Sequence, residues 1–106
     1  MKELEWNKKT YETVKNFPYD VKSDVGYLIY KVQIGESVSM PHSRSMPILG
    51  PGCFEFRLKS VTGIYRVFYC LKLENKVLVF HAFQKKSERT SAKELKQGKI
   101  NLKGMI

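Results

Sequence analysis

Hydrophobic residues in the first third of the chain recur at helical spacing. They step along the sequence by four, three and four positions, at Val21, Val25, Leu28 and Val32. Because residues at this spacing share one face of an α-helix, the pattern predicts an amphipathic helix over about residues 19–34. Gly35 is placed to end that helix.

A strand, a helix and an irregular connection are also predicted before residue 53. Residues 2–6 are predicted to form a short first strand. A helix is expected over about residues 8–16, with Asn7 as its N-cap and a break at Phe17-Pro18. Residues 36–52 contain three prolines and two glycines, so they are expected to form a connection.

The period of the pattern changes to two in the second half of the chain. Phe54, Phe56 and Leu58 alternate with charged residues, which is typical of a strand with one buried face. Two more strands are predicted over residues 64–73 and 76–83.

A short helix is expected at the C-terminal end of the chain. The sequence from Ser91 to Glu94 matches a capping box, which opens helices. Gly98 lies inside the expected helix and should leave it short or frayed, because glycine is a poor helix former.

This order of elements predicts an α+β fold, in which two N-terminal helices pack on one face of a small antiparallel-rich sheet. The length of 106 residues is that of one domain, so residues 1–106 are assigned to a single unit. No apolar run approaches the roughly 18 residues of a membrane span, and the N-terminus has no secretory apolar region. Cys53 and Cys70 match no metal-ligand spacing. We therefore expect a cytoplasmic protein with no membrane segment, metal or cofactor.

Turn positions predict how the strands pair. A turn at residues 60–63 would place Phe54, Phe56 and Leu58 opposite apolar or aromatic partners, and Arg57 directly opposite Arg66. A second turn at Glu74-Asn75 would continue the pairing with Val67 opposite Ala82, Tyr69 opposite Phe80, Cys70 opposite Val79 and Leu71 opposite Leu78. One face of the sheet is then apolar. The other is expected to face solvent and carries Glu55, Arg57, Lys59, Arg66, Phe68, His81 and Phe83.

Two arginines opposite each other in a sheet repel, so Arg57 and Arg66 need an explanation. One explanation is structural, since Glu55 is near enough to neutralise one of them. The other is an anion site, because two guanidinium groups can hold a phosphate by paired hydrogen bonds. Phe68 and Phe83 could then stack bases. Lys59, Lys85, Lys86 and Arg89 would extend the RNA-binding surface.

The formal net charge of +9 is unevenly distributed along the chain. Residues 1–52 carry seven Lys/Arg and six Asp/Glu, whereas residues 53–106 carry twelve and four. The excess is compatible with an ordinary soluble surface. It also fits a partner that is a polyanion, either nucleic acid or an acidic protein.

Three short segments together resemble the HigB-like toxins of the RelE/ParE superfamily. They are Phe54-Glu55-Phe56-Arg57, then Gly63-Ile64-Tyr65-Arg66-Val67, then His81-Ala82-Phe83-Gln84-Lys85-Lys86. Their order and spacing match, and so does the preceding helix pair. Ala82 replaces the usual glycine and Ser91 a common proline, departures that affect the last helix more than the charged residues.

The resemblance implies a RelE-like fold and the toxin of a toxin–antitoxin module. It implies a metal-independent endoribonuclease, or mRNA interferase, that cuts translated mRNA on the ribosome by attack of a ribose 2′-OH on the adjacent phosphate. Arg57 and Arg66 would hold that phosphate, Lys85 and Lys86 would bind backbone or stabilise charge, and Glu55 would orient an arginine. The implied partners are the ribosome, mRNA and an antitoxin, commonly a helix-turn-helix protein of the HigA-like type.

The proton acceptor for such a reaction is not determined by the sequence. His81 is the natural titrating candidate, although a histidine on a strand is more often a packed structural residue. Lys59 or Lys85 with a lowered pKa is another candidate, whereas Glu55 beside two arginines would be a poor base. Two other functions remain open, a ParE-like inhibitor of DNA gyrase and a nucleic-acid-binding module without catalysis.

Overall fold

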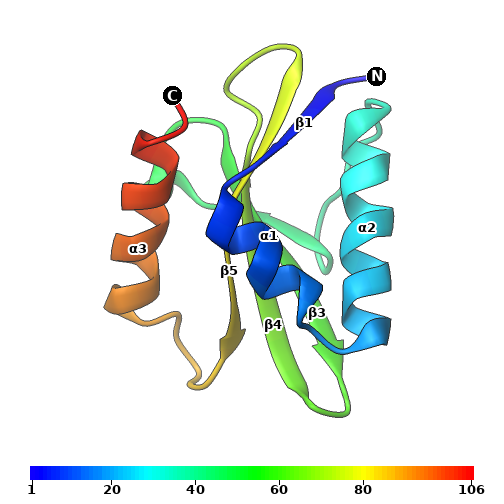
Figure 1. Cartoon of the computed structure of the whole chain (residues 1–106), viewed down its shortest axis with the longest axis vertical. Coiled ribbons are helices and arrows are strands. Elements are labelled where there is room, and N and C mark those ends of the chain that lie inside the picture. The colour runs from blue at the N-terminus through cyan, green and yellow to red at the C-terminus, as the bar shows by residue number, and fades with distance from the viewer.

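A mixed five-stranded sheet forms the centre of the molecule, and the computed structural model describes all residues from 1 to 106 (Figure 1). The strand order is β1-β5-β4-β3-β2, with β1 parallel to β5 and the other neighbours antiparallel. The strands are β1 (Glu3–Trp6), β2 (Ser43–Ser45), β3 (Cys53–Ser60), β4 (Gly63–Cys70) and β5 (Lys76–Lys85). The helices are α1 (Lys8–Lys15), α2 (Tyr19–Gln33), α3 (Ala92–Lys103) and the short 3-10 helix η1 (Pro47–Leu49). The predicted α+β class is confirmed.

The two N-terminal helices begin and end where their sequence signals lie. Asn7 caps α1 by accepting a hydrogen bond from the backbone N–H of Thr10 at 2.9 Å. The apolar stripe of α2 is buried against the sheet, and Gly35 follows the helix with a φ of +87°. This left-handed conformation lets the N–H groups of Gly35 and Glu36 return to carbonyls of the last turn.

The predicted pairing of β3 with β4 is confirmed over the whole hairpin, including Arg57 opposite Arg66. The predicted pairing of β4 with β5 is correct only up to Phe68 opposite His81. A bulge between Phe68 and Tyr69 then shifts the register, so Tyr69 lies opposite Val79 and Cys70 opposite Leu78. The three pairs expected beyond the bulge were therefore wrong, and β4 ends at Cys70, before the predicted end at residue 73.

The connection after α2 contains structure that the sequence did not predict. Its residues 43–45 form β2, which pairs with β3 at the edge of the sheet. Three residues are too few to show an alternating pattern, so the strand could not be recognised from the sequence. Beyond this short pairing, the end of β3 has no strand on its outer side.

Both faces of the sheet are covered, which contradicts the expectation of one solvent-facing side. The first hydrophobic core lies between the sheet and helices α1 and α2. A second core lies under α3 on the other face, around Phe68, Phe80 and Leu102 (Figure 1).

Helix α3 is well formed over twelve residues, so the expectation of a short or frayed helix was wrong. Ser91 caps it as predicted by accepting a hydrogen bond from the N–H of Glu94 at 3.3 Å. Gly98 is buried, and a Cβ atom there would lie 2.9 Å from the Phe68 ring. This glycine therefore allows α3 to approach the sheet closely. None of the helices is both long and apolar enough to cross a bilayer.

Candidate anion-binding site

A buried carboxylate lies between the two facing arginines. Glu55 Oε2 accepts a hydrogen bond from Arg57 Nη1 at 2.9 Å, and Glu55 Oε1 lies 3.6 Å from Arg66 Nε. The side chains of Glu55 and Arg66 are only 3% and 6% exposed, whereas that of Arg57 is 25% exposed. The structural explanation and the anion-site explanation of this arginine pair are therefore compatible, because one carboxylate cannot neutralise both cations.

The inner arginine is held by its own backbone and by Glu55. Arg66 Nη1 donates to the carbonyl of Tyr65 at 3.1 Å, and Arg66 Nε faces Glu55 Oε1 at 3.6 Å, slightly too far for a hydrogen bond. Burial lowers the pKa of Arg66, and repulsion from Arg57 adds to the effect while Glu55 partly opposes it. Because Glu55 carries one negative charge against two guanidinium groups, a positive charge is left that a further anion can neutralise.

Two further cations act on this pair. Lys85 lies near the end of β5, and its pKa is lowered first by burial and then by the charge of Arg66. Arg44 on β2 is opposite Glu55 in the register, and its charge also lowers the pKa of Arg66 and of Lys85. Arg44, Arg57, Arg66 and Lys85 around Glu55 are called the cation cluster below. The sequence missed Arg44 because β2 was not predicted.

A groove of about 920 Å³ opens directly beside the cluster, and Arg57, Lys59 and Arg66 lie on its wall. The rest of its lining comes from α2, from the connection that follows it and from β3 and β4. We call it the α2 groove. Arg57 and Arg66 can thus be reached from this groove, as an anion ligand would require, whereas Lys85 lines a small hollow beyond it.

The family model for phage-derived Gp49-like proteins matches residues 12–103 of this chain. The chain belongs to the Gp49-like family. A search of curated proteins gives no significant match.

Solved structures show that this Gp49-like protein has the fold of the RelE toxin of E. coli. Isolated RelE is 18% identical, with a TM-score of 0.58 over 83% of this chain and 89% of RelE. RelE in the intact RelBE toxin–antitoxin complex is 16% identical, with a TM-score of 0.59 over 82% of this chain and 100% of the matched chain. A double arginine-to-alanine mutant of RelE is 16% identical, with a TM-score of 0.62 over 99% of this chain and 98% of the matched chain. At this identity the likeness establishes the fold.

The aromatic residues expected to stack bases are not available in this Gp49-like protein. Phe68 is completely buried and Phe83 is 7% exposed. Their rings contact each other at 5.3 Å between centroids, and Phe68 also contacts Phe80 under α3. Their expected role in base stacking is corrected to packing of the second core, because α3 covers the face that was thought to be open.

His81 is held by α3 rather than directed at the cation cluster. Its Nε2 atom lies 2.8 Å from Glu94 Oε1, and its Nδ1 atom lies 3.5 Å from the amide of Asn101. Both ring nitrogens therefore face polar groups of the helix, an arrangement that fixes α3 on the sheet. This geometry favours the structural alternative for His81 over the catalytic one.

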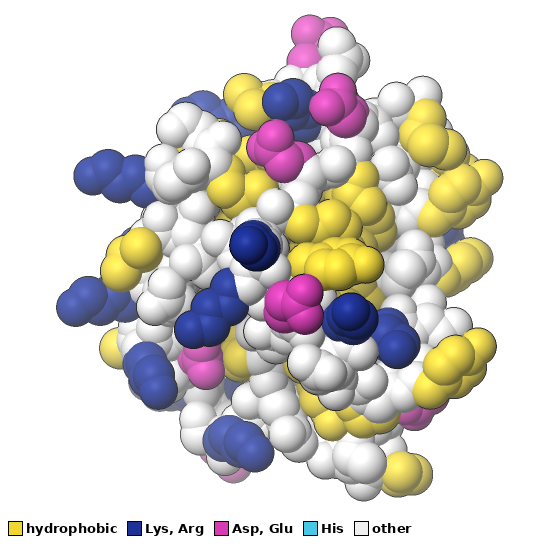
Figure 2. Space-filling view, in the orientation of Figure 1, with side chains coloured by type: hydrophobic (Ala, Val, Ile, Leu, Met, Phe, Trp, Pro, Cys, Tyr) yellow, Lys and Arg dark blue, Asp and Glu magenta, His cyan; other side chains and the backbone are white.

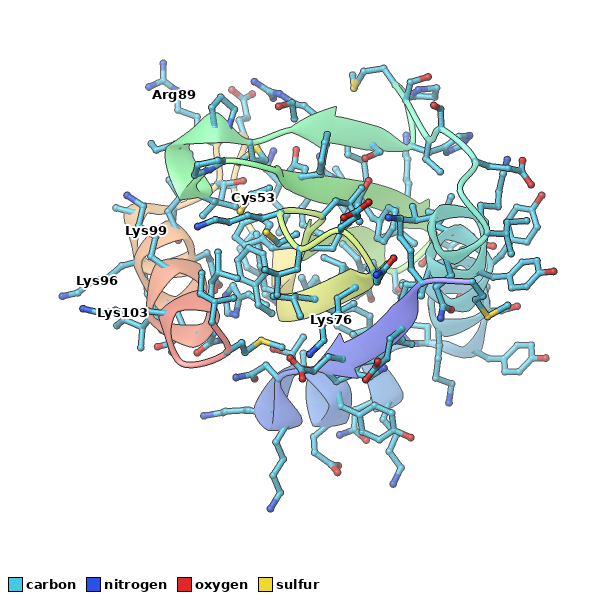
Figure 3. All side chains as sticks on the ribbon, turned by 90° about the horizontal axis from the view of Figure 1, so that it is seen from above. Cys53, Lys76, Arg89, Lys96, Lys99 and Lys103 are labelled. Carbon is cyan, nitrogen blue, oxygen red and sulfur yellow. The ribbon has the colours of Figure 1, made fainter.

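The remaining predicted cations, Lys59, Lys86 and Arg89, are exposed and lie outside the cluster. Lys59 is exposed in the α2 groove, in the same row across the sheet as Lys85. Lys86 and Arg89 are exposed and line a small hollow of about 80 Å³ beyond β5. Figure 3 shows Arg89 projecting from the body of the molecule.

Other basic residues form a separate surface on α3. Figure 2 shows Lys and Arg side chains gathered on the α3 side of the molecule. Lys96, Lys99 and Lys103 project outward from this helix (Figure 3). No group of three or more His, Cys, Asp or Glu side chains is placed to bind a metal ion. Cys53 and Cys70 are free and buried, opposite each other in β3 and β4.

Proposed function

We propose that this Gp49-like protein is the toxin of a toxin–antitoxin module of the HigB-like branch, and that it cuts translated mRNA on the ribosome. The observation that carries this proposal is the cation cluster. Four cations lie around one carboxylate, so the cluster has an excess of positive charge, and a groove gives access to Arg57 and Arg66. A phosphate diester supplies the negative charge and the acceptor oxygens that this arrangement lacks.

In the proposed reaction, the 2′-OH oxygen forms a bond to the neighbouring phosphorus and the bond to the 5′ oxygen breaks. The products are a 2′,3′-cyclic phosphate and a 5′-hydroxyl end, whose oxygen takes its proton from solvent water. Arg57 and Arg66 would bind the non-bridging oxygens and stabilise the charge that develops on them. Lys85 would accept the proton of the 2′-OH, because a lysine whose pKa is lowered is more readily deprotonated.

The proposed partners follow from the same function. E. coli RelE has been solved in complex with the antitoxin RelB. By analogy we propose that a cognate antitoxin, of the helix-turn-helix HigA-like type, neutralises this protein. The ribosome and mRNA are its proposed cytoplasmic targets.

Mapping of the 5′ ends of cellular mRNA after induced expression in a bacterium tests this function. We expect growth arrest and new 5′ ends within translated codons, and we expect these ends to disappear when translation is blocked. Growth arrest with intact mRNA and DNA-damage signalling would instead support the gyrase inhibitor. Salt-dependent RNA binding without cuts would support a module that lacks catalysis.

Arg57→Ala tests the role of the cation cluster most directly in the same measurement. Arg57 is partly exposed, so its loss should disturb folding less than the loss of buried Arg66. Removing one charge-assisted contact to phosphate costs about 1.5–3 kcal/mol, so cleavage should fall roughly 10- to 150-fold. Lys9→Ala, which removes an exposed cation from α1, is the control and should cut like the wild type. Equal cleavage by both variants would contradict the assigned role of Arg57.

A further inference from the structure

The α2 groove is much larger than one phosphate needs. Its volume of about 920 Å³ lies in the upper part of the range for small-molecule sites. Arg57 and Arg66 occupy only one part of its lining, and the rest of it is formed by α2, by residues 37–42 and by other residues of β3 and β4. The groove can therefore hold more of a ligand than the group bound by the cation cluster.

One wall of this groove is an unpaired strand edge. Strand β2 pairs only with residues 54–56 of β3, and the Arg57 N–H then donates to the carbonyl of His42 at 2.8 Å. Residues 58–60 of β3 have no strand on that side. Backbone groups of the strand are consequently free to meet a polar ligand in the groove.

The charges in the groove favour a polyanion. Arg57, Lys59 and Arg66 lie on the sheet side, and Lys31 lies on the α2 side. Asp24 is the single acidic residue in the lining. The lining therefore has a net positive charge, with cations at both ends of a path from the cation cluster to α2, although Lys31 also lies 3.9 Å from Glu36. Such a path suits a chain of phosphates.

The groove also offers one exposed aromatic ring. Tyr27 on α2 is 62% exposed and lines the groove, and Lys31 Nζ lies over one face of its ring, 5.5 Å from the ring centre, so that a base would stack on the other face. Other tyrosines of α2, including Tyr30, are exposed as well but do not line the groove. An aromatic face next to a cation is the combination that proteins use to bind a base and its phosphate in single-stranded RNA.

We propose that the α2 groove binds the RNA strand that flanks the cleaved phosphate, with a base stacked on Tyr27 and the next phosphate bound by Lys31 and Lys59. This inference rests on the proposed function and adds a second binding position to it. Phe68 and Phe83 are buried, so Tyr27 takes the stacking role that the sequence had assigned to them. The position contacts no atom of the reaction, and it would add affinity and hold the strand in place without selecting a particular base.

Binding of a single-stranded RNA of about eight nucleotides, with 2′-O-methyl groups that prevent cleavage, tests the proposal. Fluorescence anisotropy with the full chain should show that Tyr27→Ala weakens binding roughly 5- to 150-fold. Tyr30→Ala removes a tyrosine of similar exposure from the same helix and should bind like the wild type. Tyr27→Phe keeps the ring and should retain most of the affinity.

A second ligand separates this proposal from the proposed function. A dinucleotide with a single phosphate should occupy only the cation cluster, so Tyr27→Ala should bind it normally while Arg57→Ala binds it weakly. If Tyr27→Ala and Tyr30→Ala bind the longer RNA equally well, the second position is wrong and the phosphate site still stands. If an acidic peptide binds in a Tyr27-dependent way and the RNA does not, the groove is a protein-docking surface and the proposal is overturned.

Discussion

At the scale of single residues, burial decides what each charged group of the cluster can do. The arginine pair was predicted from the register, and so was a role for Glu55 beside it. The structure adds that Glu55 and Arg66 are almost completely buried while Arg57 remains open. Burial and the neighbouring charge of Arg66 also lower the pKa of Lys85, which the sequence analysis named with Lys59 as a candidate base.

The lowered pKa of Lys85 predicts a pH dependence for cleavage. The neutral amine is the form that accepts a proton, and its fraction rises as the pH approaches the pKa from below. Since that pKa is below the ordinary 10.5 of lysine, the single-turnover rate should rise with pH and level off at a pH below 10.5. Lys85→Arg keeps the charge but cannot deprotonate, so the rate should fall roughly 10²- to 10⁴-fold and lose this rise.

The matched control for this prediction is Lys86→Arg, which makes the same change at the next residue. It should keep both the rate and its pH dependence. A Lys85→Arg enzyme with the wild-type rate and slope would show that Lys85 acts only as a cation.

At the scale of elements, helix α3 shows how tertiary contact overrides local preference. Glycine inside a helix is unfavourable by about 1 kcal/mol relative to alanine, which is why the sequence predicted a frayed end. The helix forms because its inner side packs on Phe68 and Phe80, and because Asn101 donates to the carbonyl of Phe80 at 2.8 Å. Gly98 is required at the point of closest approach.

The contact at Gly98 predicts opposite effects of the same substitution in two helices. Gly98→Ala should destabilise the protein by about 1–3 kcal/mol, because the new methyl group would lie 2.9 Å from a fully buried ring. Gly26→Ala in α2 has no atom within 4 Å of the new methyl group and should stabilise the protein by up to about 1 kcal/mol. Urea unfolding of the two variants measures both values, and a stabilised Gly98→Ala protein would refute the packing role.

At the scale of the whole molecule, the two hydrophobic cores and the cation cluster occupy different parts of the sheet. Helices α1 and α2 bury one face, and α3 buries part of the other. The cation cluster lies where this second covering ends, beside the α2 groove. The basic excess of the second half of the chain is therefore divided between this cluster and the outer side of α3 (Figures 2 and 3).

This distribution predicts how RNA binding responds to salt. If the cluster and groove contact about three phosphates, the logarithm of the affinity should fall with the logarithm of the salt concentration with a slope of about −2. Raising the salt fourfold should then weaken binding roughly 20-fold. Arg57→Ala should reduce the slope by about 0.7, whereas Lys9→Ala should leave it unchanged. A slope near zero would mean that phosphate contacts do not dominate binding.

The sequence by itself determined the α+β class, the two N-terminal helices, the β3–β4 register and the facing of Arg57 and Arg66. These features depend on local periodicity, caps and a tight turn, which a short stretch of sequence encodes. Only the tertiary structure decided that α3 covers Phe68 and His81, that a bulge shifts the β4–β5 pairing and that Arg44 joins the cluster. The contacts of α3 and Arg44 join separate segments of the chain, and no local pattern records which segment will bury another. The bulge adds one extra residue, Phe80, to β5, and a regular alternating pattern does not show where such a residue falls.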